Sequence, residues 1–240
     1  MTLSSVRTGF VPLGWAWMTD TASGLDGVLL RREPKVESAA IAGVFFAFLS
    51  GAAQWLILGP LGMTGGELDD WLADDPASAF SLTLALNLAA FAAIAFLWFV
   101  AVIRRRVGNR EDRFFGSVFF GASMILLATW AIGMCLIAAP GLLDEDTLRE
   151  GGGNPVSLIA AGRALLLVML PRFEAIFVIS TSTILLRTRA APKWLAVFGY
   201  LAGLGLIVLP AFDVSTLAVF QPWVLILSVA IFFTARYSET

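Results

Sequence analysis

The sequence contains no histidine and only one cysteine, Cys135, among its 240 residues. Histidine is the commonest general base and metal ligand, so its absence excludes Ser–His–Asp and Cys–His catalysis and any histidine-ligated haem, copper or zinc held by this chain alone. A single cysteine excludes an internal disulfide and a thiolate cluster. The two lysines, Lys35 and Lys193, lie at predicted membrane edges, which leaves no candidate for a mid-membrane retinal Schiff base. We therefore expect no metal and no cofactor, with room only for a bound lipid.

Charged residues are scarce as well. They make up 14% of the chain, hydrophobic residues make up 58%, and the mean hydropathy is +0.84. A soluble domain usually has about 25% charged residues. The apolar residues are grouped into runs that reach the length of about 20 residues needed to cross a bilayer. The composition therefore predicts a polytopic membrane protein.

The apolar runs predict an all-α bundle of six transmembrane helices within residues 38–236, with no sizeable soluble domain. The expected helices cover about 38–60, 79–103, 114–139, 156–186, 193–211 and 214–235. Trp98 and Trp194 are expected near the inner membrane edge, and Trp71 and Trp223 near the outer one. The three hairpins differ in loop length and residue pattern, so an inverted-repeat transporter is not supported.

The segment before the first helix, 1–37, is expected on the cytoplasmic side. It does not resemble a secretory signal, because "GFVPLGWAWM" is short, is broken by Gly and Pro, and precedes no small-residue cleavage site. Phe10, Trp15 and Trp17 are suited to a membrane interface. Two interpretations stay open: the segment lies along the inner headgroups, or it is a terminus without a fixed position.

The distribution of basic residues supports six crossings, because lysine and arginine favour the cytoplasmic side. Six spans would place all but three of the sixteen basic residues on one side: Arg7, Arg31, Arg32, Lys35, Arg104, Arg105, Arg106, Arg110, Arg113, Arg187, Arg189, Lys193 and Arg236. The opposite loops, at 61–78, 140–155 and near Asp213, are acidic and contain only Arg149 as a basic residue. Both termini are therefore expected in the cytoplasm of a bacterium, with the protein in its inner membrane.

The fourth predicted helix contains charged residues where the surroundings should be apolar. In "LVMLPRFEAIFV", residues 167–178, Arg172 and Glu174 directly follow Pro171. An unpaired charge near mid-membrane costs at least about 2.5–3.5 kcal/mol. Residues two apart point away from each other on a regular helix. Proline lacks an N–H and its ring clashes with the carbonyl of Leu167, so a kink or opening at this point is expected to turn both side chains toward one polar pocket.

Few polar residues in the other spans are available as partners. Gln54 and Asn87 are expected at mid-depth in the first and second helices, and Arg163 is expected near the outer interface. Three interpretations stay open for Arg172 and Glu174. They bind or gate an ion, a proton or a polar solute; they form a structural buried ion pair; or one of them pairs across a subunit interface.

Two charged loops are expected to have ordinary roles. "RRRVGNREDR", 104–113, is explained by membrane topology, with specific lipid or nucleic-acid binding as the less favoured interpretation. "GELDDWLADDP", 66–76, lacks the spacing of a calcium loop and is expected to be a short solvated loop with an interfacial Trp71. Asp213 is expected to cap the last helix.

The layout resembles the uncharacterised six-span integral membrane proteins of actinobacteria. The resemblance rests on an Arg-flanked first helix, the "LWFVAVIRRR" end of the second and the late "APKWLAVFGYLAGLGLIV" helix. That family has no established activity, so the resemblance implies a fold and a bacterial membrane but no function. Abundant Ala, Gly and Arg with scarce Lys fit such a host.

Two functions are carried forward. The first is small-solute or ion transport, channel-like, through a polar site at the fourth helix. The second is a non-catalytic accessory subunit that packs against a larger membrane complex or against copies of itself. An enzyme ranks third, because the chain offers neither paired carboxylates nor a credible nucleophile. The only partner expected in every case is the lipid bilayer, and no nucleic-acid partner is expected.

Overall fold

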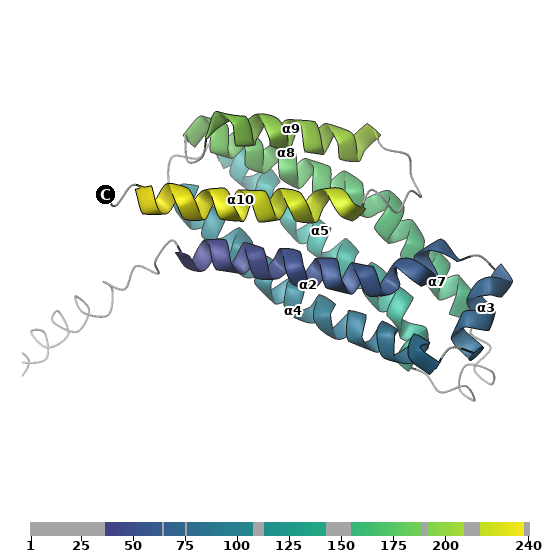
Figure 1. The fold of residues 1–240 in the computed structure, drawn as a ribbon. Coiled ribbons are helices and arrows are strands. Elements are labelled where there is room, and N and C mark those ends of the chain that lie inside the picture. Colours follow the sequence, from purple (N-terminus) through teal and green to yellow (C-terminus); the bar gives the residue numbers. More distant parts are fainter. Residues whose placement is uncertain are drawn as a thin grey trace, which may run out of the picture. The chain divides into compact units, whose positions relative to one another are not determined.

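The computed structural model describes residues 37–63, 65–74, 76–107, 113–142, 155–188, 192–208 and 217–237, and every element in them is helical (Figure 1). All of them belong to one compact unit, Val36–Thr240. The N-terminal segment 1–36 and Asp213 lie outside the described residues, so the expectations about them stay predictions. The predicted all-helical fold is confirmed for the part of the chain that the structure describes.

The long helices follow the predicted apolar runs closely. The elements are α2 (Glu37–Gly62), α3 (Gly65–Asp74), α4 (Pro76–Val107), α5 (Arg113–Ala138), the 3₁₀ turn η2 (Ala139–Leu142), α7 (Pro155–Arg163), the π-helix η3 (Ala164–Met169), α8 (Leu170–Thr188), α9 (Lys193–Val208) and α10 (Leu217–Tyr237). The start of α5 at Arg113 and of α9 at Lys193 falls where a basic residue precedes each apolar run.

Four of the helical segments are long and apolar enough to cross a membrane. They are Ile41–Gly62, Ala77–Arg105, Phe114–Leu142 and Pro155–Thr188. Two further apolar helices, Lys193–Val208 and Leu217–Phe233, are shorter. The described segments are thus those of a membrane protein. Four crossings have a helix of sufficient length, and the fifth and sixth crossings stay a prediction.

The helices pack as neighbours in a bundle. α2 lies along α4 on one side and along α10 on the other, while α8 lies between α9 and α5 (Figure 1). Glycines allow some of these close approaches. A Cβ atom added to Gly43 of α2 would clash with Ser228 of α10 and with the ring of Phe99 of α4. One added to Gly203 of α9 would clash with Ile179 of α8. These glycines serve packing within the chain, as small residues do in membrane bundles.

The acidic segment after α2 is a helix, which corrects the expectation of a solvated loop. In α3 the side chain of Leu68 is only 2% exposed, and Trp71 and Leu72 pack against the hydrophobic core. These three residues are spaced i, i+3 and i+4, which places them on one helical face. Glu67 in the first turn also suits the positive end of the helix dipole.

The bundle has an aromatic core and an apolar exterior. Trp55 of α2 is 75% exposed, and Phe45, Phe91 and Trp98 are exposed as well. An exterior of this kind is expected where lipid surrounds the helices. Trp223 is a correction, because it was expected in the outer aromatic belt but is 1% exposed in the core.

Candidate functional site

The site begins at a change of helix type in the fourth predicted span. The backbone N–H of Leu170 donates to the carbonyl of Leu165, five residues earlier, at the end of the π-helix η3. Pro171 follows at once and has no N–H to offer to the carbonyl of Leu167. A π-turn widens the helix by one residue and so accommodates this proline without ending the helix. The expected kink or opening therefore takes the form of a π-helix, an element that often occurs at functional sites.

Arg172 is held by its own helix. Its Nη1 donates to the carbonyl oxygen of Val168, with the two atoms 2.9 Å apart, and the side chain is half-buried. That carbonyl lies four residues before Arg172, in the stretch where the π-turn disturbs the regular hydrogen bonds. Arg172 and Glu174 are both among the described residues, and no ion pair joins them. The guanidinium group of Arg172 thus satisfies the carbonyl of Val168 and forms no bond with the carboxyl group of Glu174.

Glu174 is buried in the interior of the bundle. Its side chain is 1% exposed, and its Oε2 atom has no hydrogen-bond partner within the described part of the protein. It lies on α8, roughly 20 Å of helical rise from the Thr188 end of the span. Burial of an ionised carboxylate without a partner costs several kcal/mol. Protonation of the carboxyl group removes this cost, whereas the ionised form requires a compensating partner.

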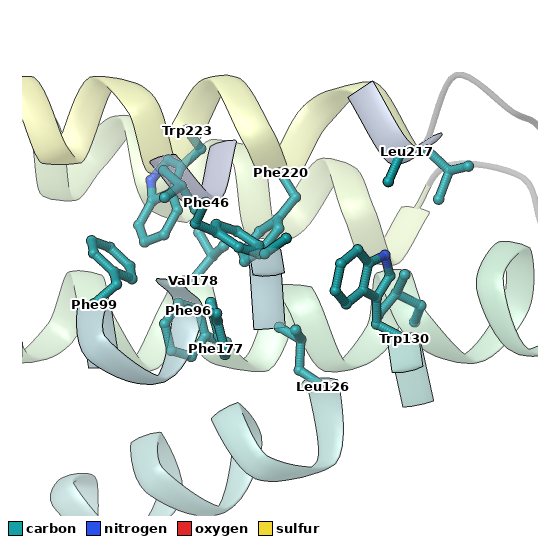
Figure 2. Packing of buried hydrophobic residues seen from close by; sticks show 14 of the residues in the cluster. Phe46, Phe96, Phe99, Leu126, Trp130, Phe177, Val178, Leu217, Phe220 and Trp223 are labelled. Carbon is teal, nitrogen blue, oxygen red and sulfur yellow. The ribbon is translucent and has the colours of Figure 1, made fainter. Parts of the chain in front are cut away.

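An aromatic cluster lies about one helical turn along α8 from Glu174. Phe177, one turn further along α8, has its ring centroid 5.4 Å from that of Phe96 in α4, 5.2 Å from Phe119 in α5 and 6.0 Å from Phe220 in α10. Figure 2 shows Phe177, Phe96 and Phe220 converging between the helices. Rings from four helices therefore meet at Phe177, three residues along α8 from Glu174.

A second buried polar feature joins α2 to α10. Nε2 of Gln221 donates to Oε1 of Gln54 over 2.6 Å, and both side chains are buried. Nε2 of Gln54 has no partner among the described residues. Gln54 was a predicted candidate, whereas Gln221 was missed although it interrupts the apolar run "AVFQPWV". Gln221 directly follows Phe220, whose ring contacts that of Phe177.

A third buried polar atom is Nε1 of Trp223, which also lacks a hydrogen-bond partner in the described residues. A Cβ atom on Gly199 would lie 3.0 Å from this nitrogen and would clash with Oγ of Ser182. α8, α9 and α10 therefore approach one another closely here. The interior of the bundle thus contains an unpaired acceptor on Glu174 and unpaired donors on Gln54 and Trp223.

The other predicted candidates lie elsewhere. Asn87 is exposed, and its Nδ2 donates to the carbonyl of Thr83 in its own helix over 2.9 Å. Nη1 of Arg163 donates to the carbonyl of Met63 over 2.9 Å, which ties α7 to the end of α2. Both of these hydrogen bonds go to backbone carbonyls, and neither involves Glu174. Whether any of the predicted residues binds or gates a solute stays a prediction.

The described residues contain no group of three or more His, Cys, Asp or Glu side chains placed to hold a metal ion. Cys135 is exposed on α5 and has no disulfide partner. The chain matches no known protein family, and no curated protein or solved structure is similar to it. The chemistry of the site must therefore be argued from its own residues.

Proposed function

We propose that the protein is a multi-pass protein of a bacterial inner membrane that moves an ion or a small polar solute across the bilayer, with Glu174 as the binding group. The observation that carries this proposal is the complete burial of an acidic side chain, one of whose oxygens accepts no hydrogen bond within the described residues. Intramembrane ionisable groups usually mark substrate or proton pathways. The proton is the first candidate, because it neutralises a carboxylate without needing a large cavity.

The π-helix η3 is the element that would change conformation during transport. η3 ends at Met169, two residues before Pro171 and about one and a half turns before Glu174. Helices broken or widened at membrane depth are a common way to build a binding site, since they free backbone groups near the solute. We propose that rearrangement between π- and α-helical hydrogen bonding in this stretch gives Glu174 access to one membrane face at a time.

The proposed topology has six spans, with both termini in the cytoplasm. Its support is the one-sided distribution of arginine and lysine, together with the two shorter apolar helices, Lys193–Val208 and Leu217–Phe233. The resemblance to six-span actinobacterial membrane proteins is part of the same proposal and supplies no activity.

Flux in reconstituted liposomes tests the function. We expect purified protein to carry protons down an imposed gradient, read with an entrapped pH-sensitive dye. Glu174→Gln keeps the size of the side chain and removes the acid, so flux should fall to the rate of protein-free liposomes. Glu174→Asp keeps a carboxyl group and should retain measurable flux.

The matched control is Asp70→Asn, which makes the same chemical change at an exposed position on α3. It should transport as the natural protein does. Equal flux in Glu174→Gln and the natural protein would reject Glu174 as the binding group. Absence of proton, sodium, potassium and neutral-solute flux in all proteins would reject transport.

The alternative is a non-catalytic accessory subunit or a homo-oligomer. It is favoured by a groove of about 500 Å³ between α2 and α4, lined by exposed side chains such as Ile41, Phe45, Phe91 and Trp98. A partner helix would fill such a groove as readily as lipid chains do. Purification in mild detergent and measurement of the particle mass distinguish the two: transport by the protein alone requires no second chain, whereas an accessory subunit co-purifies with its complex.

A further inference from the structure

A groove between α4 and α5 combines an apolar wall with positive charge. Its volume is about 420 Å³, and its walls include Leu97 and Ala101 from α4 and Met124 from α5. Arg104 and Arg105 lie at its rim, and both are exposed. None of the described residues that line it is acidic. The grooves between α2 and α4 and between α2 and α10 have no charged residue among their described lining residues, so the α4–α5 groove differs from these two.

The position of the two arginines corresponds to a membrane boundary. The apolar segment of α4 that is able to cross a membrane, Ala77–Arg105, ends at these residues. Their guanidinium groups therefore lie at the level where hydrocarbon gives way to headgroups, and long basic side chains favour that level. The groove continues from them along the apolar part of α4, toward the middle of the bilayer.

One of the arginines is held in place by an aromatic ring. The guanidinium carbon of Arg104 lies 5.0 Å from the centroid of Phe120, a cation–π contact across the groove between α4 and α5. A guanidinium group that stacks on an aromatic ring keeps its N–H donors at its edge. An arginine fixed in this way is prepared to donate to a phosphate oxygen.

We infer that the α4–α5 groove binds an anionic phospholipid, with its phosphate between Arg104 and Arg105 and one acyl chain along Leu97, Ala101 and Met124. The two positive charges complement the phosphate and the net negative headgroup. The apolar wall is reached from the hydrocarbon, which an acyl chain enters and a soluble phosphate does not. By the expected topology the lipid belongs to the cytoplasmic leaflet, whose anionic lipids attract basic side chains. This inference is independent of transport by Glu174.

Native mass spectrometry of the full-length protein in detergent tests it. We expect phosphatidylglycerol to bind more tightly than phosphatidylcholine with the same acyl chains. Arg104→Gln with Arg105→Gln should weaken phosphatidylglycerol binding about 30-fold, as follows from roughly 1 kcal/mol for each basic residue near a membrane surface. Ala101→Trp should fill the apolar part of the groove and weaken the binding of both lipids to the same extent.

Three results would overturn the inference. The first is an unchanged preference for phosphatidylglycerol in the double variant. The second is a loss of phosphatidylglycerol binding in Lys193→Gln equal to that in the double variant. The third is competition for the groove by glycerol 3-phosphate as strong as competition by the lipid. Lys193 is an exposed basic residue at the start of α9 and controls for net charge. Equal melting temperatures without lipid establish that the variants fold. If the double variant does not fold, Ala101→Trp still decides, because undiminished binding of both lipids would contradict the groove.

Discussion

The hydrogen bond between Gln54 and Gln221 shows how single polar residues connect distant parts of the bundle. The two side chains are buried, they lie 2.6 Å apart, and they join the first and last described long helices. Inside a membrane an amide without a partner is costly, whereas a matched pair costs little. The pair therefore favours the packing that brings α2 beside α10.

Removal of one member of this pair should destabilise the protein more than removal of both. We expect Gln221→Leu to lower the free energy of unfolding by about 1–2 kcal/mol, because the oxygen of Gln54 then remains buried and unpaired. Gln54→Leu with Gln221→Leu should recover most of that loss. Reversible unfolding in mixed detergent measures Gln221→Leu, Gln54→Leu and the double variant.

Asn87→Leu serves as the control, since Asn87 is exposed and bonds only within its own helix. We expect its stability to stay within about 0.5 kcal/mol of the natural protein. Strictly additive effects of the two glutamine substitutions would contradict the bond.

Some of these residues could be predicted from the sequence, and others could not. Glu174 and Gln54 were found because a polar side chain in an apolar run is costly wherever the run folds. Trp223 was assigned to the wrong place because its position along a helix gives its depth but not its face. The partner of Gln54 was missed because the two glutamines are 167 residues apart and meet only through tertiary packing.

At the scale of elements, the π-helix is fixed by its neighbours as well as by Pro171. A Cβ atom on Gly133 of α5 would lie 2.6 Å from Cδ2 of Leu166 in η3. One on Gly162 of α7 would lie 3.0 Å from the carbonyl oxygen of Gly133. The backbones of the two spans are therefore nearly in contact along this stretch, and the wide turn is part of a close-packed interface.

A large side chain at Gly133 should break that interface. We expect Gly133→Leu to destabilise the protein by about 1–3 kcal/mol or more, because overpacking displaces η3. Gly121 is the matched control on the same helix, since a Cβ atom there would have no neighbour within 4 Å. Gly121→Leu should be neutral or slightly stabilising, because leucine favours a helix more than glycine does.

Thermal unfolding of both variants in detergent provides the measurement. Equal melting temperatures for Gly133→Leu and Gly121→Leu would show that α5 does not pack against the π-helix in this way.

Most elements were predictable because apolar runs bounded by Arg, Lys or Pro leave little choice inside a bilayer. The exception is α3. Its acidic residues suggested a solvated loop, although the spacing of Leu68, Trp71 and Leu72 already indicated a helical face. The π-helix was foreseen only as some opening at Pro171, since the kind of helix depends on packing against Gly133 and Gly162.

For the whole molecule, the role of Glu174 depends on where the fourth span lies. If 166–186 crosses the hydrocarbon, the burial of Glu174 is costly and points to a role. Ile176 is two residues further along α8 and is 43% exposed, so the protein itself does not cover it. Lipid, or a second chain that packs within the membrane, would keep a reagent dissolved in water away from that position.

The most direct test is therefore the labelling of single cysteines with a membrane-impermeant maleimide in intact cells, in a Cys135→Ser background. We predict that a cysteine replacing Ser157 reacts from outside, that one replacing Lys193 reacts only after the membrane is permeabilised, and that one replacing Ile176 does not react in either condition. Reaction of the cysteine at position 176 as fast as that at position 157 would place the segment among headgroups or in solvent, and would contradict a buried acid inside a membrane bundle.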